Sequence, residues 1–174
     1  RRMPVRVARD LFAAVLLGLI TANKIARDGA TLRLPTHRAA MSDAETSLWE
    51  NVRPMMEEGG LRPPRVREIA EDLNQPPQVI ERFLFRAARL GIVHAVAKNR
   101  FYPPATMRDM GRLTERLAAK SDDGIFSVAD FRDATGIGRN VAIQVLEYFD
   151  RSGFTQRVGE GRKIKKPVDE VYKD

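Results

Sequence analysis

The stretch Thr135-Gly-Ile-Gly-Arg-Asn140 decides the fold, because the residues before and after it both predict helices. Before it, Ser127 and Asp130 have the spacing of a capping box. In such a box the serine oxygen accepts a backbone N–H of the first helical turn, and the carboxylate reaches back to accept the backbone N–H of the serine. After it, apolar residues recur at helical spacing, and polar residues occupy the opposite face of the same predicted helix. The apolar positions are Val141, Val145, Leu146 and Phe149, and the polar ones are Asn140, Gln144, Glu147 and Arg151. A short helix, a glycine-containing turn and a second helix with a polar face indicate a helix-turn-helix, whose second helix contacts nucleic acid.

A β-hairpin is predicted directly after the second helix. Gly153 ends that helix, and two segments of strand-forming residues, 154–158 and 162–165, flank Gly159-Glu-Gly161. A helix-turn-helix followed by a hairpin is a winged helix. The hairpin is also basic, since residues 151–166 contain six Lys or Arg and one acid. This pattern favours a local contact with a polyanion, although a charged edge that blocks strand pairing would have the same composition.

The same order of elements recurs earlier in the chain. Gly91 lies between a predicted helix and a predicted hairpin, as Gly153 does 62 residues later, and Asn23 has this position 68 residues before Gly91. A period of this length favours tandem repeats over one large core. We therefore expect a mainly α fold with small β-hairpins (α+β), made of tandem winged-helix domains. The expected divisions are 1–40, the carboxy-terminal half of a winged helix, then complete winged helices at 41–104 and 105–174.

The first complete repeat has its own helix signals. Ser42 and Glu45 predict a second capping box, and Pro54 should kink or shorten the helix that follows. In the first 40 residues, a helix over 7–22 and a hairpin turning at Asp28-Gly-Ala30 are predicted, with Pro35 ending the hairpin. The predicted core face of the helix after Pro76-Pro77 is Val79, Phe83, Leu84, Ala87 and Leu90. On the same helix, Arg82, Arg86 and Arg89 form a stripe that is consistent with a nucleic-acid contact or with a solvated face.

Composition excludes several classes of site. The 174 residues carry a net charge of +7 and no cysteine, so disulfides and thiolate metal sites are excluded. No apolar run approaches the roughly 20 residues that span a bilayer, so we expect a soluble, cytoplasmic protein without membrane contacts. His37 and His94 lie far apart without neighbouring ligand residues, so neither predicts a metal or catalytic site. A first residue other than methionine suggests a fragment of a longer protein.

Three segments of the last repeat resemble the last winged helix of the bacterial selenocysteine-specific elongation factors, the SelB family. They are residues 126–140, 146–151 and 153–159. The resemblance continues in the preceding winged helix, through residues 62–65 and 99–102, and in the wing of the one before, at residues 32–37. In that family an amino-terminal GTPase module carries selenocysteinyl-tRNA, and the carboxy-terminal winged helices bind the mRNA hairpin called SECIS, which recodes a UGA codon.

The resemblance implies which residues bind RNA. By position, the family's contacts include Arg139 at the start of the second helix and the wing around Gly159 and Arg162. The family has a basic residue and Gly-Asp where this chain has Asn140 and Gly159-Glu160. Together with the polar stripe and the basic hairpin, the predicted RNA-binding set is Arg139, Asn140, Gln144, Arg151, Arg157, Gly159, Arg162, Lys163 and Lys165. The alternative for Arg139 is a surface ion pair with Glu147 or Asp150.

The resemblance also implies partners. The chain contains no G-x-x-x-x-G-K-[ST] phosphate loop, so we expect a non-catalytic, monomeric RNA-binding fragment without a cofactor, with GTP and magnesium bound only by the amino-terminal module. Its partners would be the mRNA hairpin and, through the full-length protein, the ribosome and selenocysteinyl-tRNA. Two alternatives stay open. Winged helices often read duplex DNA, which favours a transcription regulator, and an array of them can also space other domains in a protein-interaction scaffold.

Overall fold

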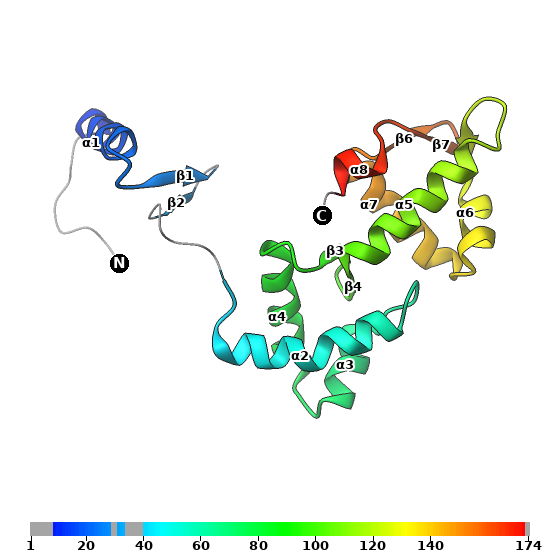
Figure 1. Ribbon diagram of the computed structural model, residues 1–174, viewed down its shortest axis with the longest axis horizontal. Helices are drawn as coiled ribbons and strands as arrows, with labels where there is room; N and C mark the ends of the chain where they lie inside the picture. Colours follow the sequence, from blue (N-terminus) through cyan, green and yellow to red (C-terminus); the bar gives the residue numbers. More distant parts are fainter. Residues whose placement is uncertain (1–8, 29–30, 34–39, 173–174) are drawn as a thin grey trace. The chain divides into compact units, whose positions relative to one another are not determined.

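The structure, a computed structural model, describes residues 9–28, 31–33 and 40–172 (Figure 1). The chain divides into two units, an amino-terminal unit of residues 1–40 and a carboxy-terminal unit of residues 41–174. In the amino-terminal unit, α1 (Arg9–Thr21) is followed by the antiparallel strands β1 (Ala26–Asp28) and β2 (Thr31–Arg33). This is the predicted order of helix and hairpin. The predicted hairpin turn at Gly29-Ala30, the stop at Pro35 and the first residues of the predicted helix lie outside the described residues.

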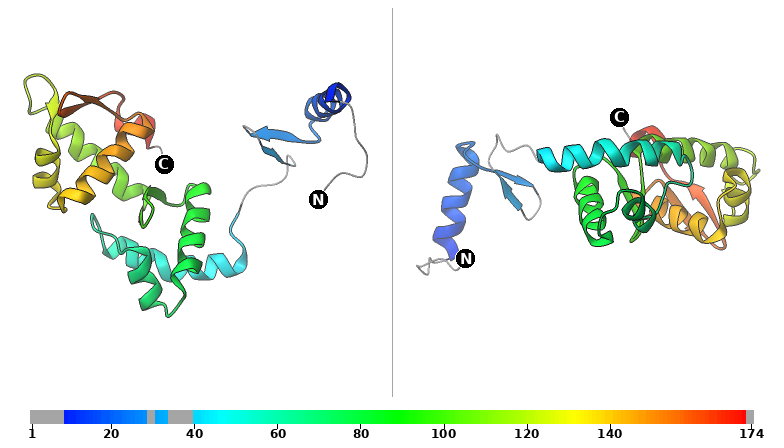
Figure 2. Two further views of the ribbon diagram at one scale, coloured as in Figure 1. Left: turned by 180° about the vertical axis from the view of Figure 1, so that it is seen from behind. Right: turned by 90° about the horizontal axis from the view of Figure 1, so that it is seen from below.

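The carboxy-terminal unit contains two successive sets of three helices, each set followed by a hairpin (Figures 1 and 2). The first set is α2 (Asp43–Glu58), α3 (Val66–Asp72) and α4 (Pro77–Arg89), followed by β3 (His94–Ala97) and β4 (Arg100–Tyr102). The second set is α5 (Pro104–Ala118), α6 (Val128–Thr135) and α7 (Arg139–Ser152), followed by β6 (Thr155–Val158) and β7 (Gly161–Ile164). The tandem winged-helix fold expected from the sequence is therefore confirmed.

The helix boundaries follow from local chemistry. Glu45 accepts the Ser42 N–H at 2.8 Å and the Ser42 hydroxyl at 3.0 Å, which completes the predicted capping box and lowers the pKa of the Glu45 carboxyl. Asp130 makes the equivalent bonds to Ser127 at the start of α6, at 2.7 and 2.8 Å. Both predicted boxes are therefore present. Pro54 lies inside α2 without shortening it, since the helix continues to Glu58.

Helix-to-hairpin transitions share one backbone conformation. Asn23, Gly91 and Gly153 have φ values of 53°, 75° and 77°, all in the left-handed region in which glycine is favoured and asparagine is tolerated. The predicted equivalence of these three positions is thus matched by their geometry. A residue in this conformation ends the helix and turns the chain back toward the hairpin.

Two elements of the last repeat were not predicted. The two-residue strand β5 (Ile125–Phe126) pairs with β7 and makes the sheet three-stranded, in the order β5-β7-β6. After the hairpin, α8 (Val168–Val171) returns the chain to the core, where Val168 and Tyr172 are 2% and 4% exposed. The helix phase predicted for α4 was wrong at one position, because Ile80 is fully buried whereas Val79 is 37% exposed.

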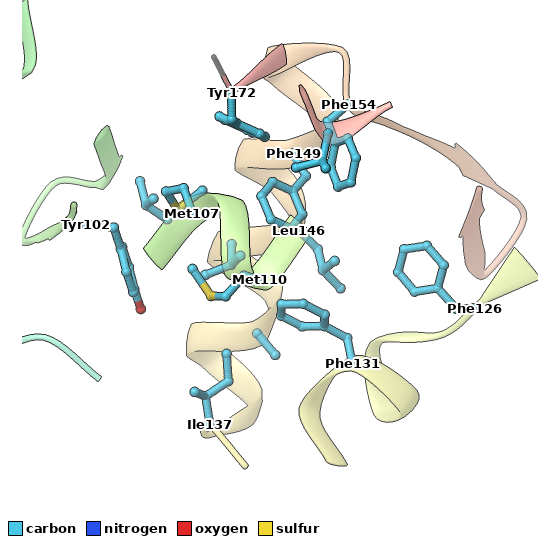
Figure 3. Packing of buried hydrophobic residues seen from close by; sticks show 14 of the residues in the cluster. Tyr102, Met107, Met110, Phe126, Phe131, Ile137, Leu146, Phe149, Phe154 and Tyr172 are labelled. Atoms are coloured by element: carbon cyan, nitrogen blue, oxygen red, sulfur yellow. The ribbon is translucent and has the colours of Figure 1, made fainter. Parts of the chain in front are cut away.

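The carboxy-terminal unit has two apolar clusters. The first lies under α2, α3 and α4, and the second under α5, α6 and α7. Figure 3 shows the second cluster, in which Phe149 packs edge-on against Phe131 and Phe154, with ring centroids 6.2 and 4.9 Å apart. Tyr102 and Val96 belong to this second cluster although they come from the β3–β4 hairpin. The hairpin of the first winged helix is therefore packed into the core of the second.

Candidate nucleic-acid interface

The turn before α7 presents the start of that helix to solvent. Gly136 ends α6 with a φ of 65°, and its N–H donates to the Arg132 carbonyl at 2.8 Å. Ile137, 2% exposed, anchors the turn in the core (Figure 3). Gly138 is the N-cap of α7, so Arg139 is the first helical residue. The fold thus fixes the backbone on both sides of Arg139.

Arg139 and Asn140 are exposed at this corner. Among the residues that the structure describes, neither side chain has a hydrogen-bond or ion-pair partner. The alternative interpretation of Arg139 required a pair with Glu147 or Asp150. Asp150 instead binds Arg162, and Glu147 is exposed. Arg139 therefore has its full set of guanidinium donors available to a ligand.

The rest of the predicted polar stripe has a different environment. Arg151 donates to the Val96 carbonyl of β3 at 3.0 Å, and its guanidinium lies over the Tyr148 ring at 5.6 Å. Tyr148 in turn is hydrogen-bonded to His94 Nδ1 at 2.9 Å. Gln144 is half-buried, and its Oε1 has no partner among the described residues. Of the stripe, Asn140, Glu147 and Arg151 are exposed, and the Arg151 guanidinium is bonded to the preceding hairpin.

The wing, defined here as residues 155–165, which comprise β6, the turn Gly159–Glu160, β7 and Lys165, carries exposed cations. Arg157, Lys163 and Lys165 are exposed, and Arg157 Nε donates to the Gly159 carbonyl at 3.2 Å. Gly161 packs against β5 so closely that a Cβ there would collide with the Ile125 side chain. That close approach lets β5 pair with β7, which ties the wing to the segment that leads into α6.

Arg162 lies under the wing rather than on its surface. It is 5% exposed, and its Nε donates to Asp150 Oδ2 at 2.9 Å, while Asp150 Oδ1 accepts the Thr155 hydroxyl at 2.6 Å. This three-residue network ties β6 and β7 to α7. The alternation of side chains along β7 could have indicated that one of two adjacent basic residues points inward. Asp150, the partner that makes burial of a charge tolerable, is not evident from the local pattern.

Arg139 and the wing turn face a common hollow. This pocket, here the loop pocket, lies between the starts of α6 and α7 and the wing. Its lining consists of Ser127, Val128, Ala129, Arg132, Arg139 and Glu160. Arg132 is already paired with Asp133 at 2.6 Å. The loop pocket therefore offers one unpaired guanidinium and one carboxylate, a donor and an acceptor that suit the edge of a nucleobase better than a phosphate.

The remaining candidates from the sequence are the two histidines and the arginine stripe on α4. Burial lowers the pKa of His94, which packs against the Tyr148 and Tyr172 rings. His37 lies outside the described residues. All three arginines of the stripe on α4 are exposed, and Arg86 is paired with Glu45 at 2.6 Å. Within the described ranges, no group of His, Asp and Glu could hold a metal ion, and no helix has both the length and the apolar character to cross a membrane.

Two family models match the carboxy-terminal unit. Residues 41–102 match the model described as "Selenocysteine-specific elongation factor, winged helix domain". Residues 118–164 match the one described as "Elongation factor SelB, winged helix".

Curated relatives and a solved structure agree with these matches. The selenocysteine-specific elongation factors of Escherichia coli (strain K12) and Haemophilus influenzae are 35% and 31% identical over 134 residues, which is 77% of this chain and 21% of each relative. The chain thus spans about a fifth of the length of these relatives. The solved mRNA-binding domain of elongation factor SelB from E. coli, in complex with SECIS RNA, is 33% identical, with a TM-score of 0.66. That match covers 72% of this chain and 100% of the solved one.

Proposed function

The chain belongs to the SelB family of selenocysteine-specific elongation factors, and we propose that its carboxy-terminal unit binds an mRNA hairpin of the SECIS type. The observation that carries the proposal is Arg139. It is exposed and unpaired among the described residues, at the start of α7 and beside the wing. A guanidinium held at this place without an internal partner is free to bind a ligand.

The geometry of an RNA hairpin determines which of its groups such a site can contact. The major groove of an RNA stem is too deep and narrow for side chains, so proteins read loop or bulged bases and grip the stem by its backbone. In this chain the loop pocket receives an unstacked base. Arg139 donates to its acceptor edge, and Glu160 accepts from its amino or imino groups. Asn140, adjacent on the exposed corner, supplies both a donor and an acceptor.

The wing supplies charge to the same complex. Arg157, Lys163 and Lys165 are exposed on one hairpin and contact stem phosphates, so that affinity falls as salt rises. Arg162 contributes through position, because its bond to Asp150 holds the wing against α7. Arg151, bound to the Val96 carbonyl, likewise contributes by fixing α7 to the β3–β4 hairpin. Gly159, with a φ of 56°, gives the wing its tight turn.

The domain divisions and the wider role belong to the same proposal. Residues 41–104 and 105–174 are two winged helices, and residues 1–40 are the carboxy-terminal half of another. The matches to the family models at 41–102 and 118–164 support the first two. In the full-length protein, a GTPase module with GTP and magnesium, selenocysteinyl-tRNA and the ribosome complete a cytoplasmic factor that inserts selenocysteine at UGA. This segment itself performs no catalysis and acts as a monomer.

A competition experiment tests the proposal. The protein is titrated against a labelled RNA hairpin, with unlabelled duplex DNA of the same number of phosphates as competitor. RNA binding that survives an excess of DNA is the expected result. Preference for the DNA would instead identify a duplex-DNA regulator, and absence of binding to either at low salt would identify a scaffold.

A further inference from the structure

The first winged helix of the carboxy-terminal unit has a pocket in the same position as the loop pocket. It lies between the starts of α3 and α4 and the β3–β4 turn, as the loop pocket lies between the starts of α6 and α7 and the wing turn. We call it the middle pocket. Its lining consists of Arg65, Val66, Arg67, Pro77, Gln78, Glu81, Lys98 and Asn99. Both winged helices therefore present an equivalent hollow, formed by equivalent elements.

The cations of the middle pocket have no partner among the described residues. Arg65, Arg67 and Lys98 are exposed, and among the described residues none of their side chains has a hydrogen-bond or ion-pair partner. Glu81 lines the same pocket and is half-buried. Residues 41–174 carry 22 basic and 21 acidic side chains. Three unpaired cations around one hollow are thus a local feature of a nearly neutral unit, as expected for a polyanion contact.

A second groove connects the middle pocket to the turn before α7. Arg65 lines both hollows, and the second one also contains Arg62, Arg100 and the turn Gly136–Gly138. Arg62 donates a hydrogen bond to the Gly136 carbonyl, which ties the groove to the turn. Basic residues, with Glu68 among them, therefore line the path from Lys98 to the turn that precedes Arg139, where the loop pocket begins.

The chemistry of this path favours an RNA backbone. Neither hollow has an aromatic side chain among its described lining residues. Single-stranded nucleic acid is usually bound by stacking its bases on aromatic rings, so unstacked bases are a poor fit. Duplex RNA presents phosphates and 2′-hydroxyls instead. Unpaired guanidinium and ammonium groups match the phosphates, and the Gln78 and Asn99 amides can bond the hydroxyls.

We propose that the middle pocket and its connecting groove bind the stem of the mRNA hairpin beyond the part held by α7 and the wing. The inference rests on the proposed function, because it takes the loop of the same RNA to lie in the loop pocket. The first winged helix then extends the contact along the stem, and the tandem arrangement measures stem length as well as loop sequence.

The experiment compares two RNAs that share one loop. One has a short stem, and the other has the same stem lengthened by roughly one helical turn. Three proteins are titrated at 50 and 200 mM salt: the wild type, the Arg67→Ala/Lys98→Ala variant and a matched control, Arg89→Ala/Lys120→Ala. The control removes the same charge from exposed side chains that lie outside both hollows and have no partner among the described residues.

The wild type should bind the long-stem RNA more tightly, and the Arg67→Ala/Lys98→Ala variant should lose that gain while binding the short hairpin normally. Loss of two phosphate contacts lowers the slope of log affinity against log salt concentration by about two. The rise from 50 to 200 mM salt should therefore weaken binding of the long-stem RNA about tenfold more for the wild type than for the variant. Glu81→Gln should strengthen binding to the long-stem RNA only, since it removes a charge that repels phosphate. Circular dichroism checks that each variant is folded.

Equal affinity of the wild type for both RNAs, or an equal loss in the matched control, would overturn the inference. If the Arg67→Ala/Lys98→Ala variant lost affinity only for a separate RNA duplex, and not for the long-stem hairpin, the assignment of the middle pocket to the same mRNA would be overturned. Failure of the wild type to bind the short hairpin would instead contradict the proposed function, so the two failures are distinguishable.

Discussion

Single residues that look equivalent in the sequence have different roles in the structure. Arg157 and Arg162 face each other across the β6–β7 ladder, and both belong to the basic hairpin. Arg157 is exposed, whereas Arg162 is 5% exposed and bonded to Asp150. The sequence predicted the charge of this hairpin correctly. It could not reveal which arginine is buried, because the deciding partner is 12 residues away on another element.

This difference can be measured as stability. Arg162→Ala leaves the Asp150 carboxylate without its partner and should lower the free energy of unfolding by about 3 kcal/mol, the low end for breaking a buried ion pair, since Asp150 is a quarter exposed. Arg157→Ala makes the same chemical change at an exposed site and should stay within about 0.5 kcal/mol of the wild type. Urea denaturation of both variants provides the values. Equal stability of the two would mean that Arg162 does not hold the wing.

Elements were predictable where their signals are local. The capping boxes at Ser42 and Ser127 form because both partners lie within one helical turn. The two-residue strand β5 has no periodicity of its own, and its nearest partner on β7 is far along the chain, since Phe126 pairs with Arg162, 36 residues later. The short helix α8 is likewise specified by packing of Val168 and Tyr172 in the core. Long-range pairing and packing therefore account for what sequence patterns missed.

The wing as an element should act through charge alone. Lys163→Ala and Lys165→Ala each remove one exposed cation, so each should weaken binding to any hairpin and lower the salt slope by about one. Titrations at several salt concentrations, with hairpins of different loop sequence, measure both effects. The protein should keep its stability because neither side chain is buried. A slope unchanged in both variants would place the wing away from the RNA backbone.

At the scale of the molecule, the two winged helices of the carboxy-terminal unit share an interface that the sequence did not predict. Arg151 reaches the Val96 carbonyl, and the Tyr148 hydroxyl meets His94 Nδ1. The site of the proposed base contact, at the start of α7, therefore lies on a helix whose other end is bonded to the β3–β4 hairpin. Each partner resembles an ordinary surface residue when its own segment is read alone.

This interface should make stability depend on pH. Burial lowers the pKa of His94 in the folded state, so the unfolded chain binds the proton more readily. The groups facing His94 are Tyr148 and Tyr172, and Arg151 lies against Tyr148. Stability is full above the unfolded pKa of about 6.5 and decreases as pH falls through 6.5 toward the lowered folded value. Lowered carboxyl pKa values, such as that of Asp130, act only at more acidic pH.

Urea denaturation at pH 7.5 and pH 5.5 measures this dependence. The wild type should lose stability at the lower pH, and His94→Gln, which cannot titrate, should lose clearly less between the same two values. An identical pH dependence in the two proteins would show that His94 is not the group responsible.

Binding of the wild type and Arg139→Ala to two hairpins tests the central claim most directly. The hairpins share one stem, and one carries the cognate loop while the other carries the same loop bases in scrambled order. If Arg139 contacts a loop base, the variant should lose on the order of 1–3 kcal/mol for the cognate hairpin and much less for the scrambled one. Its fold should survive, because the side chain is exposed at a helix start. Equal losses on both RNAs, or no loss on either, would contradict base reading by Arg139.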